Sequence, residues 1–175
     1  MESIPPSVSR NTPFRFCQSL KNISDGATPK IHSGGHFPGY NTEYLLTRSS
    51  EEKREENYWL APDSGGEKQV ILDLHKPRLI NTILLVNIHN ADSNDRSTKE
   101  FKVLLSNFPT GPWREVLHET LEDSSQMADP LPLLEFPITP KVGRYVKFFL
   151  LSFYGLGGGL NYFAVRSGIG TSIYY

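Results

Sequence analysis

The sequence has few of the features that mark several large classes of protein. It has one cysteine, Cys17, among 175 residues, so no disulfide forms within the chain. No apolar run approaches the roughly 20 residues that a membrane-spanning helix needs. The formal net charge is −1, whereas a phosphate-backbone partner usually requires a basic face. We therefore expect no disulfide scaffold, no transmembrane segment and no nucleic-acid partner.

The compartment is left open between two alternatives. Residues Met1 to Pro6 lack the basic and apolar segments of a secretory signal. The single cysteine favours a reducing compartment, but Asn22-Ile23-Ser24 is an acceptor pattern for N-glycosylation in a secreted chain. The localisation is extracellular if this chain is part of a longer secreted one, and cytoplasmic otherwise.

Motifs that carry catalysis are also missing. The sequence has no His-Glu-x-x-His and no Gly-x-Ser-x-Gly, and no residue beside Cys17 would activate its thiol. Asp92 and Asp95 are a carboxylate pair of the kind used in glycoside cleavage, but two acids in an asparagine-rich loop are typical turn formers. The sequence therefore predicts a protein that is not an enzyme.

What the chain does contain is a series of short strand signals. Thirteen prolines and 14 glycines keep regular elements short, which favours an all-β architecture. Ile31 to Tyr40 is predicted to be a loop because Gly and Pro interrupt it, and the charged run Glu51 to Glu56 a solvated loop. Alternating or continuously apolar runs predict strands at residues 12–17, 69–74, 80–89, 100–106, 113–117, 133–136, 144–153 and 160–166.

The order of these segments carries a family resemblance. The landmarks are Tyr58-Trp59, Val70 to Leu74, Phe101 to Ser106, Trp113, Arg144 to Phe148 and Leu160 to Val165. Together they resemble the discoidin domain, also called the coagulation factor 5/8 type C domain, of the galactose-binding-like superfamily. The resemblance covers about residues 40–166, and leaves 1–39 as an extension with an edge strand and 167–175 as a tail.

The resemblance implies a fold and a class of function. The fold would be a jelly-roll β-sandwich of about eight antiparallel strands. Loops at one end would bind a carbohydrate, a phospholipid head group or a protein, without catalysis.

Two features usual in that family differ in this chain. Many extracellular members join their termini through a disulfide, which one cysteine cannot form. Carbohydrate-binding members often hold calcium with an Asp-Gly-Asn loop and a glutamate in the last strand. Here Leu46 to Ser49 and Tyr162 occupy those places, which leaves Glu43 as the candidate calcium ligand. We therefore expect no cofactor.

The first candidate site is the loop Asn87 to Lys99. It leaves an apolar strand and gathers amide, carboxylate, imidazole and guanidinium groups, which together donate and accept the hydrogen bonds that sugar hydroxyls need. The alternative is a turn that caps itself, because Asn and Asp commonly hydrogen-bond their own backbone. The predicted ligand-binding residues of this loop are His89, Asn90, Asp92, Asp95 and Arg96.

The second candidate is the segment Phe153 to Asn161, which contains four glycines. Such glycines permit positive φ and let the backbone pass close to another surface. Tyr154 would offer its ring to a sugar face, and Asn161 completes the predicted set. The alternative is a tight connection between the last two strands with its aromatic rings in the core.

The third candidate is a set of residues around a Gly/Pro loop, namely His32, Ser33, His36, Phe37 and Tyr40 with Trp59. His32 and His36 have a spacing that suits a metal, but no third ligand follows at a standard spacing. Trp59 is predicted to be a structural plug, because large aromatic side chains usually bury most of their area.

The favoured prediction is recognition of a glycan or glycoprotein in a cleft between loops 89–99 and 154–161. One alternative is a protein-protein interaction module of an intracellular assembly, which the missing signal and the unpaired cysteine support. The other is binding to a phospholipid surface through Leu156 and Phe153, which the scarcity of basic residues beside that loop disfavours.

Overall fold

The computed structural model of the chain describes residues 29–47, 58–63, 68–88, 96–124, 127–128 and 131–167. These residues form eight β-strands and one 3-10 helix, η2 (Thr42–Leu46), with no α-helix among them. The strands are β1 (Lys30–Gly34), β2 (Trp59–Leu60), β3 (Gln69–Val86), β4 (Thr98–Ser106), β5 (Arg114–Thr120), β6 (Leu134–Phe153), β7 (Gly159–Leu160) and β8 (Tyr162–Arg166). The predicted all-β fold class is confirmed.

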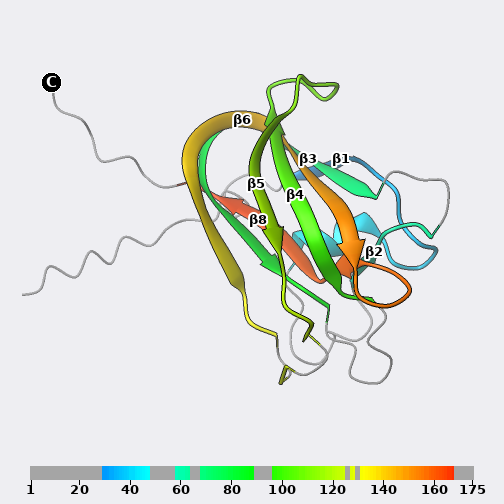
Figure 1. Ribbon diagram of the computed structural model, residues 1–175. Coiled ribbons are helices and arrows are strands. Elements are labelled where there is room, and N and C mark those ends of the chain that lie inside the picture. Colours follow the sequence, from blue (N-terminus) through cyan, green and yellow to red (C-terminus); the bar gives the residue numbers. More distant parts are fainter. Residues whose placement is uncertain are drawn as a thin grey trace, which may run out of the picture.

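Two long strands, β3 and β6, build both layers of a sandwich. The main sheet has the order β1-β3-β6-β4-β5, β8 also pairs with β3, and all these pairs are antiparallel. β3 and β6 bend together midway, where their pairing jumps from Asp73 opposite Tyr145 to Arg78 opposite Gly143. The bend of β6 forms an arch over the molecule (Figure 1). One layer therefore holds β1, β4, β5 and one half of each long strand, and the other holds β8 and the remaining halves.

The core lies between these layers and is rich in phenylalanine. Phe101 of β4 meets Phe136 of β6 at a centroid distance of 5.8 Å, and Phe148 of β6 meets Phe163 of β8 at 5.4 Å. Each contact joins one layer to the other. Alternation places Val70, Leu72 and Leu74 of β3 in this core, as the sequence pattern predicts.

The second half of β3 is buried on both faces. Its outward side chains Leu84 and Val86 are covered by a second apolar cluster that includes Leu131, Tyr162 and Ala164. A strand covered on both faces has no polar face to alternate with, which explains the continuous apolar run that the sequence shows there.

Two sequence predictions differ from the structure, and two others fall on residues that it does not describe. Ile31 to Gly34 was predicted as loop but belongs to β1, which pairs with β3; its side chains are mostly exposed, so it has no apolar period to detect. The expected strands 133–136 and 144–153 are halves of the single strand β6. The expected strand 12–17 and the charged run 51–56 lie outside the described residues.

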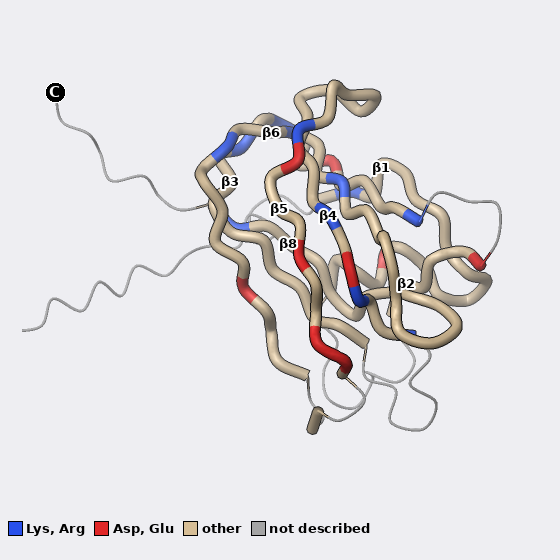
Figure 2. The backbone as a smooth tube through the Cα atoms, in the orientation of Figure 1, with Lys and Arg blue, Asp and Glu red and all other residues tan. Residues whose placement is uncertain are grey.

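The two ends of the sandwich differ in structure and in charge. At the arch end are the bends of β3 and β6; at the opposite end, the loop end, lie Val86, Thr98, Thr120, Phe153 and Tyr162, each where a strand begins or ends. Lys and Arg gather at the arch end, whereas Asp and Glu follow β5 toward the loop end (Figure 2).

One ion pair fixes the bend at the arch end. Arg144 donates to both carboxylate oxygens of Asp73, at 2.8 and 2.9 Å, and the backbone N–H of His75 donates to Asp73 at 2.7 Å. His75 has a φ of 65°, the left-handed conformation that turns the strand. The hydrogen bonds from Arg144 lower the pKa of Asp73, partial burial opposes this, and the His75 amide lowers it further.

Candidate functional site

The loop end is organised around the buried side chain of Asn87. Its Nδ2 donates to the carbonyl of Thr98 at 3.0 Å, and its Oδ1 accepts from the backbone N–H groups of Thr98 and Ile88 at 3.0 and 2.9 Å. One amide side chain thus closes the stem of the loop between β3 and β4 and satisfies three backbone groups there.

The stems of the two candidate loops lie side by side. Thr98 Oγ1 donates to the carbonyl of Gly159 at 2.7 Å, and the backbone N–H of Tyr154 donates to Ser97 at 2.9 Å. Ser97 and Gly159 also form a parallel β-bridge. The first and second candidate loops, which the sequence separates by more than 50 residues, therefore start from one shared base.

The glycines of the second loop allow close backbone contact with β2. A Cβ placed on Gly159 would collide with the backbone carbonyl of Trp59. Trp59 itself is fully buried, donates from Nε1 to the carbonyl of Gly35 at 2.8 Å and packs edge-on against Phe148. The prediction that Trp59 is a structural plug is confirmed.

Tyr154 is half-buried and spans two elements at the loop end. Its hydroxyl donates to the carbonyl of Leu121, the residue after β5, at 2.9 Å. The Lys99 ammonium lies 5.5 Å from its ring centroid. The hydroxyl of Tyr154 is therefore bonded within the protein, and its ring lies beside Lys99.

Arg96 stands beside the third candidate segment. Its guanidinium carbon lies 6.0 Å from the ring centroid of Phe37. Phe37 and Tyr40 are 6.1 Å apart, and Tyr40 and Tyr58 are 4.8 Å apart. These three half-buried rings form an aromatic row next to Arg96. The third candidate already contained Phe37 and Tyr40, whereas sequence reasoning missed Tyr58 and the position of Arg96 beside the row. The sequence signal of the row is three aromatic residues flanking a Gly/Pro loop and a charged run.

The remaining predicted ligand residues divide into two groups. Asn161 is 7% exposed, and its backbone N–H donates to Val86 at 2.9 Å, so it belongs mainly to the loop base. His89, Asn90, Asp92 and Asp95 lie outside the described residues.

The described residues contain no candidate metal site. Among those residues, no three His, Cys, Asp or Glu side chains are grouped so as to hold a metal ion. Glu43 accepts a hydrogen bond from Thr42 at 3.2 Å, and the His32 ring lies against Tyr145. In the same part of the chain, no helix is long and apolar enough to cross a membrane.

Comparison with known proteins identifies the fold. The sequence matches no protein-family model and no curated protein. The structure matches the Clostridium perfringens protein CpGH89CBM32-5, solved with GalNAc-β-1,3-galactose, with a TM-score of 0.65 and 13% identity over 83% of this chain and 99% of that one. The chain has the same jelly-roll sandwich fold as that protein, the fold that the sequence resemblance predicted.

Two further structures have the same fold. The family 32 carbohydrate-binding module of NanJ from C. perfringens, solved with galactose, matches with a TM-score of 0.60 and 12% identity over 80% of this chain and 93% of that one. The family 32 module of EndoD from Streptococcus pneumoniae matches with a TM-score of 0.60 and 14% identity over 85% of this chain and all of that one.

Two of these three structures are named as carbohydrate-binding modules. This jelly roll also occurs within a longer chain: 86% of the present chain matches only 28% of SpGH29, with a TM-score of 0.59 and 13% identity. The TM-scores establish the shared fold, whereas sequence identities this low do not identify the ligand of the present chain.

Proposed function

We propose that this chain is a non-catalytic module that binds carbohydrate at its loop end. The observation that carries the proposal is the joined base of the two loops, where Asn87, Thr98 and Gly159 hold the stems together. Rigid stems that support polar loops pre-organise a site, which lowers the entropic cost of binding a flexible ligand. Two structures with this fold were solved with galactose or a galactose-containing disaccharide, which supports carbohydrate as the class of ligand.

Each group at this end has a proposed role. Arg96, with His89, Asn90, Asp92 and Asp95, bonds sugar hydroxyls. A sugar face stacks on the ring of Tyr154 or of Phe37, because the apolar face of a pyranose suits an aromatic surface beside a few polar groups. Asn161 supports these residues from the base.

A glycan array probed with the intact chain tests this proposal. We expect binding to galactose-containing glycans that falls at least about tenfold in Arg96→Ala, a loss of about 1.4 kcal/mol. Lys76→Ala, at the arch end, is the control and should bind like wild type. The proposal fails if no glycan binds, or if Arg96→Ala binds as well as wild type.

A further inference from the structure

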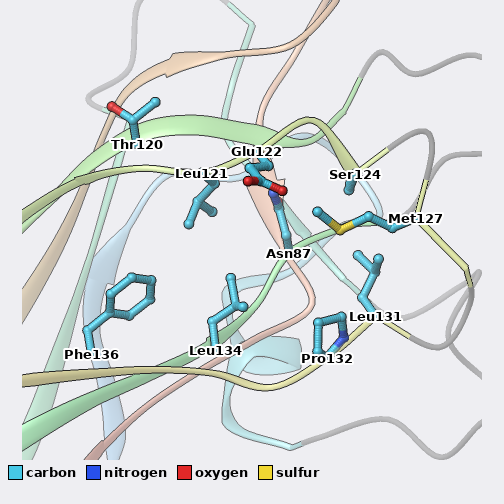
Figure 3. A pocket seen from close by; sticks show the side chains of 10 residues that line it. All are labelled: Asn87, Thr120, Leu121, Glu122, Ser124, Met127, Leu131, Pro132, Leu134 and Phe136. Atoms are coloured by element: carbon cyan, nitrogen blue, oxygen red, sulfur yellow. The ribbon is translucent and has the colours of Figure 1, made fainter.

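A cavity of about 200 Å³ opens between the edges of the two layers, near the loop end. Thr120 and Leu121 border it from the end of β5, in one layer, and Leu134 and Phe136 border it from β6, in the other (Figure 3). The remaining walls are Asn87, Glu122, Ser124, Met127, Leu131 and Pro132.

The inner polar groups of this cavity are already bonded to the protein. Asn87 uses its amide on Thr98 and Ile88, and Ser124 Oγ donates to the carbonyl of Ile88 at 2.6 Å. The other polar side chains of the wall, Thr120 and Glu122, belong to exposed residues. A sugar would find few partners for its hydroxyls inside, and burying those hydroxyls unpaired is costly.

The size and lining of the cavity favour one aromatic ring. An engineered protein cavity of about 150 Å³ lined by Leu, Ile and Phe stays dry and binds benzene. Here Leu121, Leu131 and Leu134 supply aliphatic contacts, while Phe136 and Met127 supply an aromatic ring and a thioether. Both of these groups interact more favourably with an aromatic ring than with an aliphatic one.

The charge around the opening favours a neutral or positively charged ligand. Glu122 lines the cavity, and Glu119 is exposed on the strand that leads to it. Lys99, whose carbonyl accepts the N–H of Leu121, directs its ammonium to the ring of Tyr154. An anionic ligand would approach carboxylates at this rim.

From these observations we infer that the cavity binds a small aromatic group, neutral or cationic, carried by a small molecule. This second site does not depend on carbohydrate binding and uses none of the residues predicted to bind sugar.

Methyl NMR of the intact chain tests the inference directly. The chain has two methionines, Met1 and Met127, so ¹³C-methyl-methionine labelling gives a probe in the wall of the cavity. Benzyl alcohol, benzylammonium and benzoate each present a phenyl ring, and they are respectively neutral, positively charged and negatively charged. We expect saturable shifts of the Met127 methyl, with benzylammonium binding roughly two- to fivefold more tightly than benzoate at low salt.

Two variants and one control separate the contributions. Leu134→Trp fills the cavity and should abolish the shifts, whereas Leu79→Trp makes the same change at an exposed leucine of the arch end and should not. Glu122→Gln should reduce the preference for benzylammonium over benzoate, because Glu119 remains, while benzyl alcohol binds as before. Far-UV circular dichroism checks that each variant folds. If Leu134→Trp does not fold, the titrations of the wild-type chain with the three ligands decide whether the cavity binds an aromatic ring.

Three outcomes overturn the inference. The first is the absence of a saturable Met127 shift with all three ligands. The second is equal binding of benzyl alcohol and cyclohexylmethanol, its aliphatic counterpart. The third is benzoate binding as tightly as benzylammonium. None of them bears on the glycan array, so failure of this site and failure of the carbohydrate site are told apart.

Discussion

At the scale of single residues, Asn87 is the side chain on which the loop end most depends. It is 5% exposed and makes three hydrogen bonds to the backbone, so its removal leaves buried N–H and C=O groups without partners. The sequence suggested a turn former at this position, but which backbone groups it satisfies depends on Thr98, eleven residues later.

We predict that Asn87→Ala lowers the free energy of unfolding by about 2 kcal/mol, because three buried backbone groups lose their partner. Urea denaturation measures this. Asn107→Ala, at an exposed asparagine in the turn after β4, should change stability by less than about 0.5 kcal/mol. Equal effects of the two substitutions would contradict the role given to Asn87.

A second residue-scale prediction concerns pH. The pKa of Asp73 is lowered in the folded chain, chiefly by hydrogen bonds from Arg144. The stabilisation is therefore present above the unfolded-state pKa of about 4 and is lost as pH falls through the lower folded-state pKa. We expect Asp73→Asn to lower the melting temperature at pH 7 by roughly 3 °C and to differ little from wild type well below pH 4. Melting curves across this range check it, and a deficit that persists in acid would refute the assignment.

At the scale of elements, the glycine-rich segment holds β7 against β2. Gly159 pairs with Leu60, and its Cα faces the carbonyl of Trp59 at a distance that leaves no room for a side chain. The sequence predicted close backbone approach from the glycines, but not which surface they would approach.

Gly159→Ala should therefore destabilise the chain by about 3 kcal/mol, because β7 must separate from β2 to admit the methyl group. Gly39→Ala is the control: Gly39 has a positive φ of 89° but no atom within 4 Å of an added Cβ, so only backbone strain of about 1 kcal/mol is expected. Thermal denaturation compares the two. A milder effect at Gly159 than at Gly39 would show that the contact with Trp59 is not tight.

Sequence alone recovered the buried strands and missed the features that depend on pairing. The runs in β3, β4 and β8 were found because one or both faces are apolar. β1 escaped because it is held mainly by backbone hydrogen bonds and its side chains face solvent. The union of 133–136 with 144–153 was hidden because Pro137 and Pro140 interrupt the pattern, although proline is tolerated at the sheet edge where this half of β6 lies.

The candidate site was predicted only in part, because local sequence patterns identify loops but not the contacts between them. Polar density singled out the loop with Arg96, and the glycines singled out the loop with Tyr154. The contacts of Tyr154 with Leu121 and of Tyr40 with Tyr58 join segments that are distant in the sequence, so local patterns do not predict them.

At the scale of the whole molecule, the two layers share their central strands. Because β3 and β6 each run through both layers, neither layer keeps its central strands if the other unfolds. We predict one cooperative transition, with far-UV circular dichroism and tryptophan fluorescence giving the same midpoint. Two separate midpoints would show that the layers are independent.

The central claim, carbohydrate binding at the loop end, is tested most directly by locating the ligand. Amide ¹H–¹⁵N spectra of the intact chain are recorded during titration with the best glycan from the array. We predict saturable shifts at Arg96, Ser97 and Tyr154 and none at Lys76 and Arg78 of the arch end. Shifts confined to the arch end, or no shifts at a saturating glycan concentration, would contradict it.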